Sequence, residues 1–222
     1  MLEIKTYTNI ELAEVLGGSS SRQALKKKLD RYKIEYEIIG RGNNIKFEIK
    51  RIENPFKIYC ITELGIPAQS DFDTMLYFYY FYFCDDEFSC MTAEEKQEFM
   101  DKKEHYISRQ TSRTWEKYLE KKQWIAFSDD ECIYYFSKGG EHKVTTQEKY
   151  RKAWKMYWSM VEQGCGSSEA MFVVSSKYGG VPRKHPLPQK NAFHLGEIDE
   201  FIEMIVSEVE RRMNQTINTE IK

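Results

Sequence analysis

The chain has no strong excess of either charge. Its 222 residues carry 33 Lys and Arg against 35 Asp and Glu, which gives a formal net charge of −2. A strongly basic total would favour nucleic-acid binding directly, so such a function has to rest on local patches. Hydrophobic residues at 41% and charged residues at 31% exclude a disordered chain and fit one large or two small globular domains.

Paired cysteines, a leader segment and a membrane-spanning segment are also missing. The five cysteines form no CxxC, and we interpret them as reduced core residues that bind no metal. The first residues contain no hydrophobic leader, which favours a cytoplasmic protein. The longest apolar run, Met75 to Cys84, has ten residues. A membrane span needs about twenty, so we expect no membrane association.

No catalytic motif is present. The sequence contains no GxxxxGK[ST] loop, no GxGxxG after a strand and no GxSxG elbow. The four histidines are scattered, and the acidic runs 85–87 and 129–131 are typical of exposed turns. We therefore predict a protein that is not an enzyme, with no catalytic residues, no cofactor and no metal. An unrecognised site, such as that of a metal-dependent nuclease, is the least favoured alternative.

Residues 1–52 combine two short helices with a hairpin. Thr8 and Glu11 form a capping box ahead of a first helix, and Gly17-Gly18 ends it. A second helix, predicted from Ser21 to about Tyr32, places four basic residues and a glutamine between its apolar positions. Alternating apolar residues over 34–38 and 45–49 then predict two strands around a glycine-rich turn. Residues 19–51 hold ten Lys and Arg against four acidic residues, a net charge of +6.

This order of helix, turn, basic helix and hairpin resembles the winged helix-turn-helix family. The resemblance covers about 45 residues and implies that the second helix enters the major groove of DNA with its first residues at base edges. The residues that it implicates are Ser21, Arg22, Gln23, Lys26, Lys27 and Arg41. Arg22 and Gln23 would contact bases, and the three other cations would hold phosphates. The alternative is a solvated basic helix face in a small α+β domain.

Residues 72–163 form the second predicted unit. The segment 75–83 is apolar on every side and predicts a core helix that also offers a dimer interface. A central strand is the competing assignment. Further helices are predicted from Thr92, which opens a second capping box, to about His105, from Ser108 to Lys121 and over 145–163. The segment 85–101 is acidic, with one lysine against seven acidic residues, whereas 138–155 has six basic residues against two.

Segments 124–127 and 132–136 predict a second hairpin with an acidic tip at 128–131. Residues 107–125 resemble the recognition helix and first wing strand of bacterial winged-helix proteins. The apolar stripe of this helix leaves Arg109, Gln110, Ser112, Arg113 and Lys117 facing outward. The resemblance implies that all of these except Ser112 bind DNA. The acidic tip would repel phosphate, so contact with a protein is an equal alternative for this unit.

The remaining residues, 164–222, are predicted as a C-terminal loop and helical extension. Ser167 or Ser168 would cap a helix that stops at Gly179-Gly180. Residues 181–191 hold three of the five prolines and predict an extended loop, whose Arg183 and Lys184 could reach a DNA backbone. A last helix, about 196–213, has an apolar stripe that either completes the core or forms a dimer contact.

The sequence thus predicts an α+β, mainly α fold with two winged helix-turn-helix units. The expected divisions are 1–52, a connector at 53–71, 72–163 and 164–222. The expected function is sequence-specific binding of double-stranded DNA by a homodimer. Tandem winged units resemble regulators and replication initiators of phages, plasmids and conjugative elements. The alternative is a phage-encoded, anti-CRISPR-like inhibitor of a bacterial defence system, which would use the aromatic and acidic surfaces to bind a protein partner.

Overall fold

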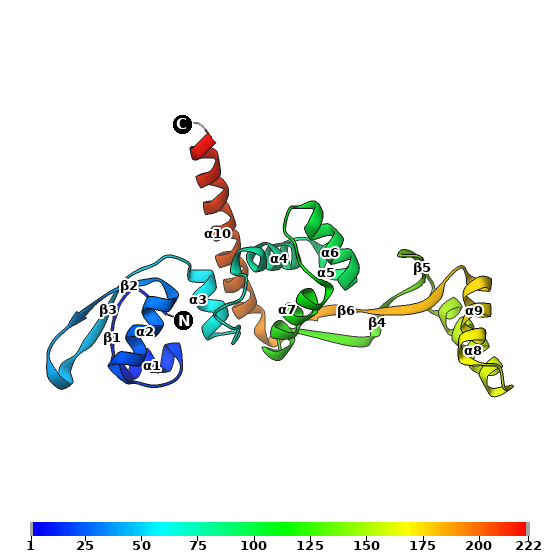
Figure 1. The fold of residues 1–222 in the computed structure, drawn as a ribbon, viewed down its shortest axis with the longest axis horizontal. Helices are drawn as coiled ribbons and strands as arrows, with labels where there is room; N and C mark the ends of the chain where they lie inside the picture. Colours follow the sequence, from blue (N-terminus) through cyan, green and yellow to red (C-terminus); the bar gives the residue numbers. More distant parts are fainter. Residues whose placement is uncertain (1, 221–222) are drawn as a thin grey trace. The chain divides into compact units, whose positions relative to one another are not determined.

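The computed structural model describes residues 2–220, and the side chains of all of them except residues 43, 128–130 and 216–220. The protein is α+β and mainly helical, with two three-stranded antiparallel sheets in its described part (Figure 1). The chain divides into two compact units. Unit 1 comprises 1–124 and 191–222, and unit 2 comprises 125–190. This division differs from the predicted boundaries, because the last helix belongs to the same unit as the first residues.

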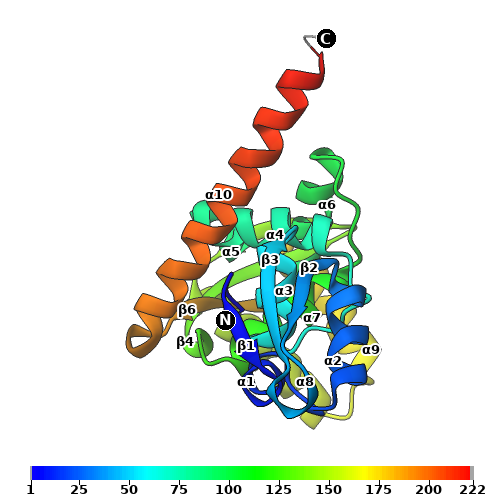
Figure 2. The same ribbon diagram turned by 90° about the vertical axis from the view of Figure 1, so that its left-hand side faces the viewer.

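The N-terminal part of unit 1 has the predicted elements with an additional first strand. β1 (Thr6–Thr8), α1 (Asn9–Leu16) and α2 (Arg22–Tyr32) precede β2 (Ile34–Ile39), a 3-10 turn η1 (Gly42–Asn44) and β3 (Lys46–Ile52). The strands form an antiparallel sheet in the order β1-β3-β2 (Figure 2). The capping box is confirmed, because Thr8 Oγ1 accepts from Glu11 N while Glu11 Oε2 accepts from Thr8 N.

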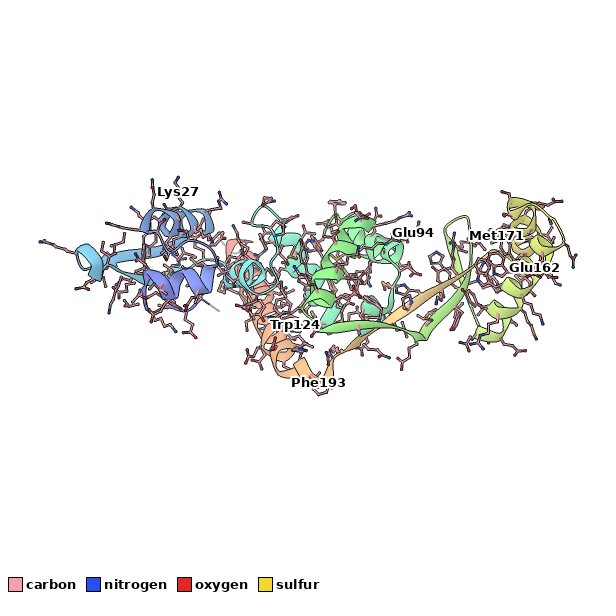
Figure 3. All side chains as sticks on the ribbon, turned by 90° about the horizontal axis from the view of Figure 1, so that it is seen from below. Lys27, Glu94, Trp124, Glu162, Met171 and Phe193 are labelled. Carbon is pink, nitrogen blue, oxygen red and sulfur yellow. The ribbon has the colours of Figure 1, made fainter. Side chains whose placement is uncertain are left out.

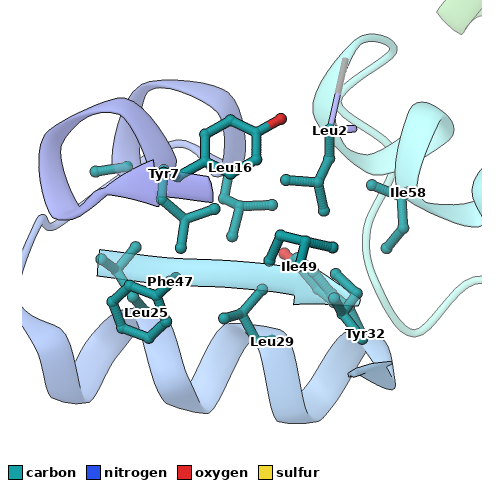
Figure 4. Close-up of a cluster of buried hydrophobic side chains, with 12 residues drawn as sticks. Leu2, Tyr7, Leu16, Leu25, Leu29, Tyr32, Phe47, Ile49 and Ile58 are labelled. Atoms are coloured by element: carbon teal, nitrogen blue, oxygen red, sulfur yellow. The ribbon is translucent and has the colours of Figure 1, made fainter. Parts of the chain in front are cut away.

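The two helices are held to this sheet by an aliphatic core. Leu25 and Leu29 project from α2 toward Phe47 and Ile49 of β3 (Figure 4), and all four side chains are buried. The spacing of four between the two leucines of α2 puts them on one helical face. The opposite face of α2 is left for solvent.

The rest of unit 1 is helical and rich in aromatic rings. It contains α3 (Pro55–Thr62), α4 (Phe72–Cys84), α5 (Asp86–Cys90), α6 (Ala93–Lys102), α7 (Arg109–Lys121), a 3-10 turn η2 (Ala192–His194) and α10 (Leu195–Glu220). Phe201 of α10 lies at the centre, with ring centroids 5.2 Å from Tyr59, 5.1 Å from Trp124 and 5.7 Å from Tyr79. The segment predicted as a connector thus contains a helix, α3, whose Phe56 is buried against Phe201.

The prediction of a core helix at 75–83 is confirmed, whereas its part in a dimer interface stays a prediction. α4 buries most of its side chains, and none of its aromatic rings is exposed. The stripe of the last helix also completes the core, because Ile198, Phe201 and Ile205 are fully buried. Both faces that were considered for a dimer are therefore used inside unit 1.

Unit 2 departs from the predicted second hairpin. The segments on both sides of 128–131 belong to one strand, β4 (Ile125–Lys138), and the turn follows at Gly139-Gly140 before β5 (Glu141–Thr145). β4 also pairs with β6 (Val181–Lys190), with an irregularity between Phe127 and Cys132 that takes up the segment predicted as a turn. The predicted hairpin tip at 128–131 is therefore wrong, because the pairing partner of β4 comes from a distant part of the sequence.

The predicted proline-rich loop is also wrong, since these residues form β6. Successive N–H groups along a strand point to opposite edges. Prolines 182, 186 and 188 are separated by even numbers of residues, so their ring nitrogens all lie on the same edge of β6. When that edge faces away from β4, the pairing of the two strands loses no N–H donor. β6 is an edge strand in the order β5-β4-β6, which is the place in a sheet where proline is tolerated.

Two helices complete unit 2. α8 (Gln147–Glu162) is capped by Thr146 and begins two residues after the predicted start, whereas α9 (Ser167–Tyr178) begins after Gly166 without a side-chain cap. The predicted capping by Ser167 or Ser168 is wrong. The core of unit 2 is small and contains Phe136, Ala153 and Val174. Among the described residues of the chain, no helix is long and apolar enough to cross a membrane.

Candidate nucleic-acid interface

The first turn of α2 carries the strongest predicted site. Ser21 Oγ accepts a hydrogen bond from Ala24 N at 3.3 Å and starts the helix. Arg22, Gln23, Lys26 and Lys27 follow, and all four are exposed. Lys27 extends away from the protein (Figure 3). The structure thus brings five of the twelve predicted site residues together on one helix.

Three cations of this helix have no acidic partner among the described residues. None of Arg22, Lys26 and Lys27 forms an ion pair with another described residue, and the first turn of α2 contains no acidic residue. Asp30 lies near the other end, where its Oδ1 accepts from Tyr36 Oη at 3.0 Å. Burial, together with this hydrogen bond, raises the pKa of Tyr36. The helix dipole adds partial positive charge at the N-terminus of α2, which favours an anionic ligand there.

Not every basic residue of this segment is available. Lys28 donates to the carbonyl oxygens of Leu16, at 3.1 Å, and Gly17, and so ties α2 to the turn after α1. On the hairpin, Lys50 pairs with Glu48 at 2.8 Å and Arg51 pairs with Glu35 at 3.5 Å. Of the net charge of +6 over 19–51, α2 carries +4, from five basic residues against Asp30, and residues 33–51 carry the remaining +2.

Arg41 lies at the end of the β2–β3 hairpin, beyond the last strand pair, Ile39 with Lys46. Its side chain is exposed and forms no ion pair with a described residue. Gly40 and Gly42 on either side have φ values of 89° and 57°, which glycine adopts without steric cost. The predicted wing therefore has a basic tip.

α7 offers a weaker site than the sequence indicated. Ser108 caps it, accepting from Thr111 N at 3.0 Å, and Gln110, Arg113 and Lys117 are exposed. Arg109 forms an ion pair with Glu94 of α6, so its charge is partly compensated. Ser112 is fully buried, and the prediction that it faces outward is wrong.

A buried ion pair fixes α6 against α7. Lys96 Nζ lies 2.5 Å from Glu116 Oε1 and also donates to Ser89 O at 3.0 Å. The ammonium lies 5.1 Å from the ring centroid of Tyr82. Sequence reasoning placed Lys96 in an acidic stretch and missed the pair, because only the fold brings residues twenty positions apart into contact.

Arg183 and Lys184 lie on β6 of unit 2, opposite Tyr135 and Tyr134 of β4, and both are exposed. As neighbours on a strand they point to opposite faces. Unit 2 also contains a pocket lined by Lys143, Lys149 and Lys177, which was not predicted as a site. The available signal was the excess of basic residues over 138–155.

Three of the four histidines lie against an aromatic ring or a carboxylate. His105 stacks on Tyr77, His142 lies against Tyr135, and His194 Nδ1 is 3.3 Å from Glu197 Oε1. Within the described residues, no group of three His, Cys, Asp or Glu side chains could hold a metal ion. Of the cysteines, Cys60 is buried, Cys84 is exposed and the other three are half-buried, so their assignment as core residues holds for Cys60 alone.

No family model, no curated protein and no solved structure matches the chain. Its function is therefore inferred from the residues described above.

Proposed function

We propose that the protein binds double-stranded DNA in a sequence-specific manner, with α2 in the major groove. The observation that carries the proposal is the exposed N-terminal half of α2, where Arg22, Lys26 and Lys27 have no ion-pair partner among the described residues. Arg22 and Gln23 are the side chains that pair bidentately with guanine and adenine. The lysines would neutralise flanking phosphates.

The order β1-α1-α2-β2-β3 supports a winged helix-turn-helix interpretation of residues 1–52. α2 then corresponds to the recognition helix, and the β2–β3 hairpin with Arg41 corresponds to the wing. A second helix that contacts DNA, α7 of unit 1, is a further proposal. We propose that the protein serves as a transcriptional regulator or replication initiator of a mobile genetic element, acting as a homodimer.

The experiment is selection of duplex DNA from a random library by the wild-type protein and by the Arg22→Ala/Gln23→Ala variant, at two salt concentrations. Lys102→Ala on α6 is the control, because it removes an exposed positive charge outside the proposed site. We expect an enriched motif for the wild type and the control, and its loss in the double variant. A protein that binds no duplex at low salt contradicts the proposal.

A second candidate function, binding to a protein partner, is favoured by the exposed rings of unit 2. Trp158 of α8 is 55% exposed and Phe172 of α9 is 73% exposed. The aromatic helix α4, which first suggested a protein-binding inhibitor of a bacterial defence system, is buried and does not support it. Recovery of one stoichiometric partner from a bacterial lysate by the wild type, but not by a Trp158→Ala/Phe172→Ala variant, together with absent DNA binding, would establish this alternative.

A further inference from the structure

Unit 2 contains a basic pocket that the sequence motifs did not indicate. It has a volume of about 600 Å³, and its lining includes Lys143, Lys149, Lys177, Thr146, Phe136 and Tyr178. Pockets that hold small groups or parts of larger ligands are usually about 300–1,000 Å³. The site is therefore large enough for a phosphate and part of the molecule that bears it.

Three separate elements bring the lysines together. Lys143 lies on β5 opposite Phe136 of β4, Lys149 is in the first turn of α8, and Lys177 is the next-to-last residue of α9. The backbone N–H of Lys149 donates to the Thr146 hydroxyl at 3.3 Å, which fixes the start of α8. Tyr178 stacks on Phe136 with ring centroids 5.4 Å apart, and this pair provides a rigid apolar wall.

All charged side chains that line the pocket are positive. None of its lining residues is acidic, and none of the three lysines forms an ion pair with a described residue. The nearest acidic residue of the same helix turn, Glu148, pairs instead with Lys152 at 2.7 Å. Cations that converge without a counter-charge raise the local concentration of anions. Lysine ammonium groups are common ligands of phosphate.

We propose that this pocket binds a phosphate group, and that the phosphate belongs to the backbone of DNA. The assignment to DNA rests on the proposed function, whereas phosphate binding follows from the pocket itself. Unit 2 would then supply a contact with DNA that is separate from α2 and carries no sequence information.

The experiment is lysine acetylation of the full-length chain, read by mass spectrometry, with and without duplex DNA and, separately, inorganic phosphate. We expect DNA to protect Lys143, Lys149 and Lys177 several-fold. Lys152 is the matched control, since it lies on the same helix, is exposed and is outside the pocket. Protection of Lys26 and Lys27 alone overturns the inference and leaves the proposed function standing. Protection of the pocket lysines alone supports the inference and contradicts binding through α2.

The inorganic phosphate arm separates the two sources of the ligand. Protection of the pocket by inorganic phosphate but not by DNA supports phosphate binding and overturns its assignment to the DNA backbone. Absence of protection by either ligand overturns the inference entirely.

A triple variant, Lys143→Gln/Lys149→Gln/Lys177→Gln, gives an independent measurement. We expect it to keep the selected motif while lowering the slope of log K against log[salt] by about 0.9 for each DNA phosphate that the protein no longer neutralises. Lys152→Gln should leave that slope unchanged. An unchanged slope in the triple variant, with circular dichroism showing a folded chain, overturns the inference.

Discussion

Lys96 Nζ lies 2.5 Å from Glu116 Oε1, and the two side chains are 1% and 13% exposed. The pair joins α6 to α7 and is completed by the carbonyl oxygen of Ser89 and by the ring of Tyr82. A buried ion pair is strongly coupled, because removal of one member leaves the other charged and without a partner.

We therefore expect Lys96→Met to lower the free energy of unfolding by about 3–5 kcal/mol. The double variant Lys96→Met/Glu116→Leu should recover most of this loss, because no unpaired charge is left buried. Urea unfolding followed by circular dichroism measures both values. A single variant as stable as the wild type would show that the pair contributes nothing.

We expect unit 1 to fold without unit 2, because the chain leaves and re-enters it at hydrogen-bonded residues. The backbone N–H of Asn191 donates to Trp124 O at 2.9 Å, and its side-chain Nδ2 donates to Gln123 O at the same distance. The chain thus leaves and re-enters unit 1 at adjacent residues. We expect a variant with 126–189 replaced by an Asn-Gly turn to unfold cooperatively, because Trp124 and its aromatic neighbours are retained. Aggregation or loss of the cooperative transition would contradict this prediction.

Arg22 and Arg109 should contribute differently to DNA affinity. Arg22 has no ion-pair partner among the described residues, whereas Arg109 is already paired with Glu94. We expect Arg22→Ala to weaken binding to the selected motif by about tenfold or more, as the loss of a bidentate base contact does. Arg109→Ala should change it by less than about threefold, because one surface ion pair contributes little. Fluorescence anisotropy at fixed salt concentration provides the comparison, and equal effects would contradict the assignment of α2 as the reading helix.

We expect the stability of unit 1 to depend on pH through the protonation of His105. Burial lowers the pKa of His105, against the opposing effect of Asp71 and Glu104, and its ring stacks on Tyr77 with centroids 4.0 Å apart. The folded state therefore binds this proton less readily than the unfolded state, whose histidine pKa is about 6.5. The contribution to stability is complete above that value and decreases as the pH falls through the lowered pKa.

The matching variant is His105→Phe, which keeps a ring beside Tyr77 and removes the titration. We expect its free energy of unfolding to change less than that of the wild type between about pH 7.5 and pH 5. Identical pH profiles for the two proteins would show that His105 does not contribute.

Local patterns of residues were sufficient to predict most helices. The capping boxes at Thr8 and Thr92, the apolar spacing in α2 and the aromatic run of α4 all form as predicted, because caps and helical periodicity act within a few residues. The N-terminal hairpin also forms as predicted, since its two strands are consecutive and joined by a glycine-rich turn.

The predictions failed where distant segments pair. Residues 128–131 have the composition of a turn and residues 181–190 that of a loop, yet both belong to the paired strands β4 and β6. The pairing of two strands that are about fifty residues apart is decided by tertiary contacts, which override local preference. The same reason explains why Lys96 was not matched with Glu116.

The sequence by itself determined the helices, the first hairpin and the basic face of α2, because hydrogen bonds and apolar spacing within a segment specify them. Only the tertiary structure decided which cations keep their charge uncompensated. Lys28, Lys50 and Arg109 are engaged by carbonyl or carboxylate oxygens, whereas Lys143, Lys149 and Lys177 converge on one pocket. Charge is a property of each residue, but its compensation depends on neighbours that folding brings from elsewhere in the chain.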